Sequence, residues 1–126
     1  MNGTLKLKNP IRVNDKEVID LAYNTENITA ALFCEADAKK RTACGSKNVS
    51  VTPAAELDYG LHLYLGFAAI IAEDATFAFA DLERIKGADV VDVMKIGRNF
   101  ILKSEALAES NSGERSETMP NTSTQA

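Results

Sequence analysis

Residue types that catalyse reactions are sparse in this sequence, and His62 is the first to consider. It is the chain's one histidine and follows Asp58 by four residues, so the two side chains would lie one turn apart on a helix. A histidine oriented by a carboxylate can serve as a general base. The same spacing is typical of an exposed polar pair on the less apolar strip of a helix, and we interpret His62 and Asp58 in that way.

The two cysteines, Cys34 and Cys44, could in principle form a disulfide, a metal site or a nucleophile. Both lie on or just beyond one predicted helix, where ten residues span about 15 Å. A disulfide needs Cα atoms within about 7 Å, so we expect none between them. Two cysteines and one histidine do not supply four zinc ligands. We interpret both as ordinary reduced thiols, as in a cytosolic protein.

Asp89 and Asp92 form a carboxylate pair at the start of a predicted helix. A helix cap and a favourable interaction with the helix dipole explain both residues, so we expect Asp89 to cap that helix. The segment "KIGRNFILK" (95–103) carries three cations among apolar residues, and we interpret its Gly97 as a helix-packing residue. Nucleotide-binding, hydrolase and metalloprotease motifs are absent. The sequence therefore predicts no catalytic, cofactor-binding or metal-binding residue and no enzyme.

Length and charge narrow the class of protein further. At 126 residues the chain has the size of one domain. Its net charge is −4, and residues 51–126 carry twelve acidic against six basic side chains. Because nucleic-acid binding needs a clustered basic footprint, we expect no nucleic-acid partner. The most apolar run, "LYLGFAAIIA" (63–72), is half of the roughly 20 residues that span a membrane, and we expect neither a membrane segment nor a signal peptide.

Alternation of apolar and polar residues in "LKLKNPIRVNDKEVIDL" (5–21) predicts a β-hairpin at about 4–23. The apolar residues of both runs occupy odd positions: Leu5, Leu7, Ile11 and Val13, then Ile19, Leu21 and Tyr23. A two-residue turn at Asn14-Asp15 would place Ile19 opposite Pro10 and split that set over two faces. We therefore expect a three-residue loop, or a bulge at the turn, that pairs Ile11 with Ile19, although Asn-Asp also suits the tighter turn.

Two features of the hairpin bear on its surroundings. Pro10 has no amide to donate, so it belongs on an edge or at a break in the pairing. Lys6, Lys8 and Arg12 share one strand face, and that row is either a docking site or a solvated face that protects the edge. The sequence favours neither. A lone hairpin is marginally stable in water, so it must pack on helices or on another chain.

The rest of the chain predicts helices at about 28–43, 53–72, 78–86 and 89–103. Thr52 and Pro53 are a typical cap and first residue for the second helix, which is apolar nearly all round and should be the core helix. Gly60 and Gly66 inside it each cost about 1 kcal/mol relative to alanine, so we expect another backbone to approach closely there. The polar composition of residues 104–126 predicts a disordered tail.

The predicted fold class is therefore α+β, mostly α. An N-terminal β-hairpin is followed by a small bundle of three to four helices, and residues 1–103 form a single globular domain ahead of the disordered tail. Large apolar side chains of the helical part are the candidates for contact with another protein. The predicted partner-binding residues are Leu63, Phe67, Phe77, Phe79, Met94 and Phe100. Phe77 and Phe79 lie in a connection, where phenylalanines are more often core residues than an exposed docking site.

Three blocks together resemble the tail assembly chaperone proteins of long-tailed phages and prophages. They are "LKLKNPIRVNDKEVIDL" with "ENITAALFCEADA", then "TPAAELDYGLHLYLGFAA", then "DLERIKGADVVDVMKIGRNFIL". The order and spacing of a short hairpin, an amphipathic helix, an apolar helix and a closing "NF" helix carry the resemblance over residues 4–102. The turn "ND" departs from the glycine that is more typical of the family, and the segment 45–51 and the tail have no counterpart.

The resemblance implies a non-enzymatic function without a cofactor. Such proteins bind the tape-measure protein during tail morphogenesis, can recruit tail tube subunits, and act in the bacterial host cytoplasm without remaining in the mature virion. A homo-oligomer is compatible with this role. Two alternatives stay open: a small structural or tail-completion protein of the virion, and a small helical regulatory protein.

Overall fold

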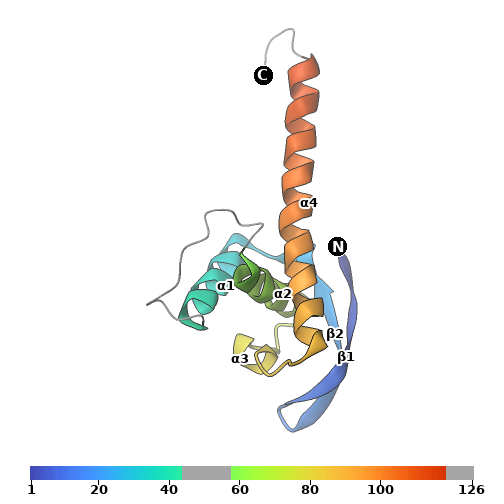
Figure 1. The fold of residues 1–126 in the computed structure, drawn as a ribbon, viewed down its shortest axis with the longest axis vertical. Helices are drawn as coiled ribbons and strands as arrows, with labels where there is room; N and C mark the ends of the chain where they lie inside the picture. Colours follow the sequence, from blue (N-terminus) through green and yellow to red (C-terminus); the bar gives the residue numbers. More distant parts are fainter. Residues whose placement is uncertain (44–57, 119–126) are drawn as a thin grey trace.

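The computed structural model describes residues 1–43 and 58–118, with side chains described up to residue 103. A long two-stranded antiparallel hairpin, β1 (Asn2–Val13) and β2 (Lys16–Asn24), leads through the short η1 (Thr25–Asn27) into the helices. These are α1 (Ala30–Ala43), α2 (Tyr59–Glu73), α3 (Phe79–Leu82) and α4 (Ala88–Thr118), and Figure 1 shows them gathered to one side of the hairpin. The predicted fold class, a hairpin followed by a small set of helices, is confirmed.

The turn of the hairpin contains two residues, so the expected three-residue loop is wrong. Val13 pairs with Lys16, and both Asn14 and Asp15 have positive φ, at 53° and 66°. Asparagine and aspartate adopt this left-handed conformation more readily than other side chains, and a two-residue turn of this kind matches the twist of the strands. The local turn chemistry of Asn-Asp therefore decided the loop length.

The bulge lies within the strands and not at the turn. Lys6 pairs with Asp20, but Ile11 pairs with Val18, so the register shifts between these two points. The expected pairing of Ile11 with Ile19 is wrong, and the Ile19 side chain is 40% exposed. The prediction for Pro10 is confirmed, because this residue lies in the break, exposed to solvent.

The shifted register lets the apolar residues of β1 keep to one face. Leu7, Ile11 and Val13 are buried, and Leu5 lies opposite Leu21, which is fully buried. Paired residues project to the same face of a sheet, so this face packs on the helices. A bulge in mid-strand thus allows the odd-numbered apolar residues of β1 to face the helices together.

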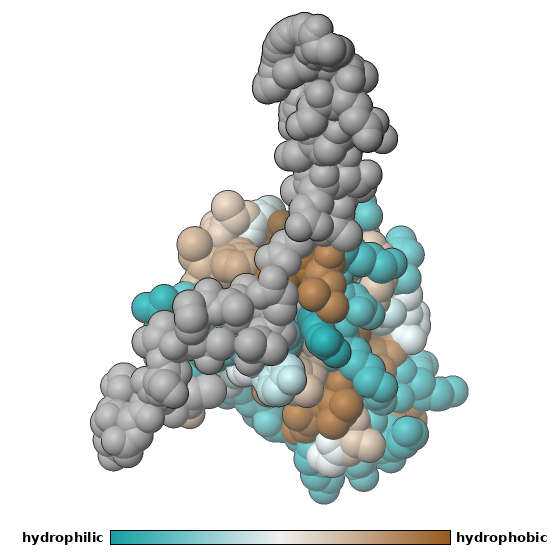
Figure 2. Space-filling view, turned by 45° about the horizontal axis from the view of Figure 1, so that its top comes forward, coloured by the Kyte–Doolittle hydropathy of each residue, from teal (hydrophilic) through white to brown (hydrophobic). Residues whose placement is uncertain are grey.

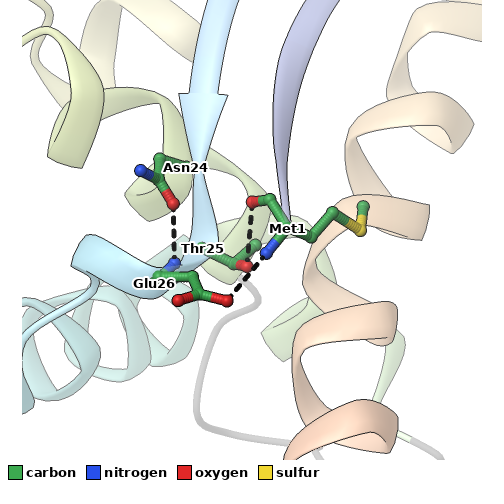
Figure 3. A network of polar contacts seen from close by, with 4 residues as sticks. All are labelled: Met1, Asn24, Thr25 and Glu26. Atoms are coloured by element: carbon green, nitrogen blue, oxygen red, sulfur yellow. Dashed lines mark hydrogen bonds and ion pairs between the residues drawn. The ribbon is translucent and has the colours of Figure 1, made fainter.

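The open end of the hairpin is fastened to η1 (Figure 3). The carbonyl oxygen of Met1 accepts hydrogen bonds from the amide of Thr25, at 2.9 Å, and from its hydroxyl, at 3.1 Å. The Met1 ammonium lies 3.3 Å from a carboxylate oxygen of Glu26, whose amide donates to the Asn24 side chain at 2.9 Å. These contacts close the ribbon opposite its turn.

The crossing of α2 and α4 is the centre of the helical part. A Cβ atom at Gly66 would overlap the Val93 carbonyl, and one at Gly97 would overlap the His62 carbonyl. Two helix backbones therefore touch at this crossing, which confirms the packing roles predicted for Gly66 and Gly97. From Leu61 to Ile70 only Leu63 is not buried, so α2 is the core helix.

Several predicted helix ends differ from those of the structure. The α2 helix begins at Tyr59, because Asp58 has non-helical backbone angles and accepts a hydrogen bond from the Leu61 amide at 3.0 Å. The predicted start at Thr52 and Pro53 lies outside the described residues. The α3 helix has four residues in place of the predicted 78–86, because the amides of Arg84 and Ile85 donate to carbonyls three residues back in tight turns.

The last helix continues past residue 103, where the prediction ended it. Helical backbone extends to Thr118 and rises beyond the rest of the molecule (Figure 1). The side chains of residues 104–118 and all of 119–126 lie outside the described part of the chain, so the disorder predicted for 104–126 stays a prediction. The polar composition argued against a packed core in this segment. The stretch "SEALAES" is nevertheless rich in alanine, leucine and glutamate, which favour a helix even when no core is formed.

Candidate protein-binding surface

Two of the six predicted partner-binding residues lie in the core. Phe67 and Phe79 are 2% and 5% exposed, and both rings contact that of Tyr64, with centroids 5.0 and 6.1 Å away. The Tyr64 hydroxyl donates a 2.7 Å hydrogen bond to Glu83. This aromatic cluster fixes α3 on α2, so Phe67 and Phe79 are corrected to core residues that no partner reaches in this structure.

The other four predicted residues keep part of their surface accessible. Leu63 on α2, Phe77 in the connection before α3, and Met94 and Phe100 on α4 are each half-buried. Leu63, Phe77 and Phe100 also pack on the core cluster. They come from different elements, so a binding surface requires neighbours that the sequence prediction did not include.

Phe100 has such a neighbour in Phe33 of α1. The two rings lie 6.4 Å apart at a tilt of 48°, and both side chains are half-buried. Leu32, beside Phe33, is also half-buried, and Ala36 is the one buried residue of α1. We call Leu32, Phe33 and Phe100 the Phe33–Phe100 surface. Figure 2 shows apolar residues in several places on one face of the molecule, next to hydrophilic ones.

Sequence analysis overlooked Phe33 because of the spacing of its neighbours. The apolar stripe expected on α1 follows Ile28, Ala31, Leu32 and Ala36, and Phe33 lies off that stripe. The size of the Phe33 side chain was the signal that could have identified it. A phenylalanine that lies off the apolar stripe of a polar helix needs a packing partner from another element. The partner is Phe100, 67 positions later in the chain.

An ion pair beside this surface holds α1 on α2. The Lys40 ammonium lies 3.0 Å from the Asp58 carboxylate, and the two side chains are 14% and 18% exposed. Burial raises the pKa of Asp58, but the hydrogen bond from the Leu61 amide and the Lys40 charge outweigh it, so the net shift is downward. Asp58 therefore caps α2 and anchors α1 in its charged form.

His62 differs from its interpretation as an exposed residue. Its side chain is fully buried, its ring centroid lies 5.8 Å from that of Tyr59, and its carbonyl contacts the backbone of α4 at Gly97. The physical reason is the close helix crossing, which encloses this turn of α2. Fully buried, His62 offers no face to a substrate, and the structure supports no general-base role for it.

Asp89 also differs from its predicted role as a helix cap. It lies inside the first turn of α4, fully buried, and its two oxygens accept from the amides of Lys8, at 3.0 Å, and Asn9, at 2.8 Å. The Lys8 hydrogen bond is the main reason that the pKa of Asp89 is lowered despite burial. Both oxygens of this carboxylate are therefore bonded to the bulged strand.

Two of the three residues in the basic row of the hairpin lie opposite acids of the other strand, while Lys8 lies in the break of the pairing. Lys6 pairs with Asp20 and Arg12 pairs with Glu17, and each pair projects to one face of the ribbon. Opposite charges across a strand pair stabilise a sheet and leave little net charge to attract a partner. Of the two alternatives for this row, the register supports the solvated, edge-protecting face.

Other sites are excluded only for the part of the chain that the structure describes. Cys34 is exposed on α1, and Cys44 lies outside the described residues. Over residues 1–43 and 58–103, whose side chains the structure describes, no cluster of three or more histidine, cysteine or acidic side chains could hold a metal ion. Within the same ranges, no helix has the length and apolar character needed to span a membrane.

The chain was also compared with known proteins. Comparisons with protein-family models, with curated proteins and with solved structures give no match.

Proposed function

We propose that this protein is a tail assembly chaperone of a long-tailed phage or prophage, which binds the tape-measure protein during tail morphogenesis. The Phe33–Phe100 surface carries the structural side of the proposal. It offers two aromatic rings and a leucine from two helices, partly open to solvent, on an acidic protein. Aromatic anchors of this type commonly dominate the energy of protein–protein contacts.

The order of elements agrees with what the resemblance implies. A hairpin precedes an amphipathic helix, an apolar core helix and a closing helix, as in the three blocks of sequence that carry the likeness. The hairpin covers one side of the helices with a charged outer face, which protects its strands from pairing with other chains. The helices offer the Phe33–Phe100 surface to a client.

The client's chemistry determines how it would bind. A tape-measure protein presents long amphipathic helices, and such a helix can place apolar residues three and four positions apart against a surface of apolar side chains. Its contact with Phe33 and Phe100 would hide apolar surface that otherwise causes aggregation. The chaperone needs no bond-making chemistry for this, only surface that remains available while the tail tube is absent.

Co-expression tests the proposal. The chain, carrying an affinity tag, is produced together with the tape-measure protein encoded near it, and the purified complex is analysed by mass spectrometry. We expect the tape-measure protein to co-purify and to be more soluble than when it is produced alone. A tape-measure protein that neither co-purifies nor gains solubility would disprove the proposed function.

Analysis of finished particles separates this function from a structural one. A chaperone leaves before the virion is complete, so we expect purified particles to lack the chain. A stoichiometric amount in the particles would show instead a structural or tail-completion protein.

A further inference from the structure

The break in β1 is filled by a residue from the far end of the domain. Between the pairs Lys6–Asp20 and Ile11–Val18, four residues of β1 lie opposite the single residue Ile19. Asp89 faces this break with both carboxylate oxygens, bonding the adjacent amides of residues 8 and 9. Pro10, next in the chain, has no amide that needs an acceptor.

The turn by itself would give the hairpin another register. If the pairing of Val13 with Lys16 continued without interruption, Lys8 would lie opposite Leu21 and Lys6 opposite Tyr23. The strand ladder would then be unbroken, but a lysine would face a leucine that the folded chain buries completely. The observed register gives up part of the ladder and places Leu5 opposite Leu21 instead.

We propose that Asp89 selects the register of the hairpin by supplying the two hydrogen-bond acceptors that the shifted strand has lost to the bulge. The two hydrogen bonds are partly buried, and a partly buried amide that loses its acceptor destabilises the fold, so the shifted register is favoured only while these acceptors are present. A neighbouring contact supports the same alignment, because the Asn9 side chain donates to the Lys86 carbonyl at 3.4 Å.

This inference concerns the free chain and does not rest on the proposed function. On this inference, the contact of α4 with β1 determines the hairpin's register together with the local sequence. A strand whose side-chain period is two is sensitive to such control, because the register decides which residues face the core.

Cross-strand NMR contacts in the full-length chain test the inference. Two variants remove the acceptors: Asp89→Ala loses both, and Asp89→Asn retains one. The matched control is Val93→Ala, which removes buried side-chain atoms from the next turn of α4 without touching a bond to β1. The pair Arg12–Glu17, near the turn, serves as an internal reference because it is common to both registers.

We expect the wild type and Val93→Ala to show the Leu5–Leu21 contact. In Asp89→Ala a Lys8–Leu21 contact should replace the Leu5–Leu21 contact, while the Arg12–Glu17 contact is retained. In Asp89→Asn we expect the Leu5–Leu21 and the Lys8–Leu21 contacts to be present together. Retention of Leu5–Leu21 alone in Asp89→Ala would overturn the inference. Loss of Arg12–Glu17 as well would also overturn it, because Asp89 would then support the whole hairpin and not the choice of register.

Discussion

The ammonium of Lys40 lies 3.0 Å from the carboxylate of Asp58, so the last turn of α1 is bound to the residue that caps α2. Neither side chain exposes more than a fifth of its surface. This pair fixes the position of α1, and with it Phe33, relative to the core helix.

The substitution Asp58→Asn should destabilise the protein by on the order of 1–2 kcal/mol, a value between those for exposed and buried ion pairs. Asparagine still caps a helix well, so the loss reports the ion pair with Lys40. Urea unfolding followed by circular dichroism measures it. The matched control is Arg41→Gln, which breaks an exposed pair with Asp37 and should change stability by less than about 0.5 kcal/mol. Equal effects of the two substitutions would contradict the account.

Acid should weaken the fold through Asp58 and Asp89. The pKa of each is lower in the folded chain than the ordinary value of 3.8. The unfolded chain therefore binds more protons, and the stability that these groups contribute is fully present above pH 3.8 and lost as the pH falls through the folded pKa values. Unfolding free energies measured at several pH values from neutral downward should fall most steeply below that point. In Asp58→Asn the fall should be shallower, and an unchanged slope would refute the role given to Asp58.

The substitution Gly97→Ala should destabilise the protein by about 3 kcal/mol or more, because the new methyl group would overlap backbone atoms of α2 at His62 and Gly66. Backbone at a helix crossing cannot move aside as a side chain can. Gly3→Ala is the control, since its methyl would meet only the end of the Tyr23 side chain. Thermal unfolding of both variants provides the comparison, and a stable Gly97→Ala protein would disprove the close crossing.

The substitution Phe79→Ala should cost about 3–5 kcal/mol of stability, as removal of a buried aromatic ring usually does. Because Phe79 lies in the core, the fraction of the variant that remains folded should bind the client as the wild type does. Chemical unfolding and a binding titration below the unfolding temperature separate the two effects. Weaker binding without lost stability would return Phe79 to the binding surface.

The sequence predicted those features that depend on neighbouring residues. Alternation revealed the hairpin, and Gly66 and Gly97 indicated a close helix crossing before its partner was known. The register was missed because the residue that satisfies the bulge, Asp89, lies 80 positions from Asn9. No local pattern can report a hydrogen bond of that separation.

The residues of the candidate surface were predicted only in part, for a related reason. Size and apolar character identified Phe100, but they also selected Phe67 and Phe79, which the folded chain buries. Phe33 was missed because its importance comes from a contact between α1 and α4. Exposure is a property of packing, and apolar residues of the surface and of the core have the same sequence signal.

The most direct test of the central claim is the affinity of the purified chain for the tape-measure protein, compared between wild type, Phe33→Ala and Phe100→Ala. Ile71→Ala is the control, since Ile71 is also half-buried against the core but is not part of the Phe33–Phe100 surface. Loss of an aromatic anchor at a hot spot removes about 2 kcal/mol or more, so we expect at least roughly thirtyfold weaker binding for both phenylalanine variants and wild-type binding for Ile71→Ala. Undiminished affinity in both phenylalanine variants, with folding intact by circular dichroism, would contradict the account.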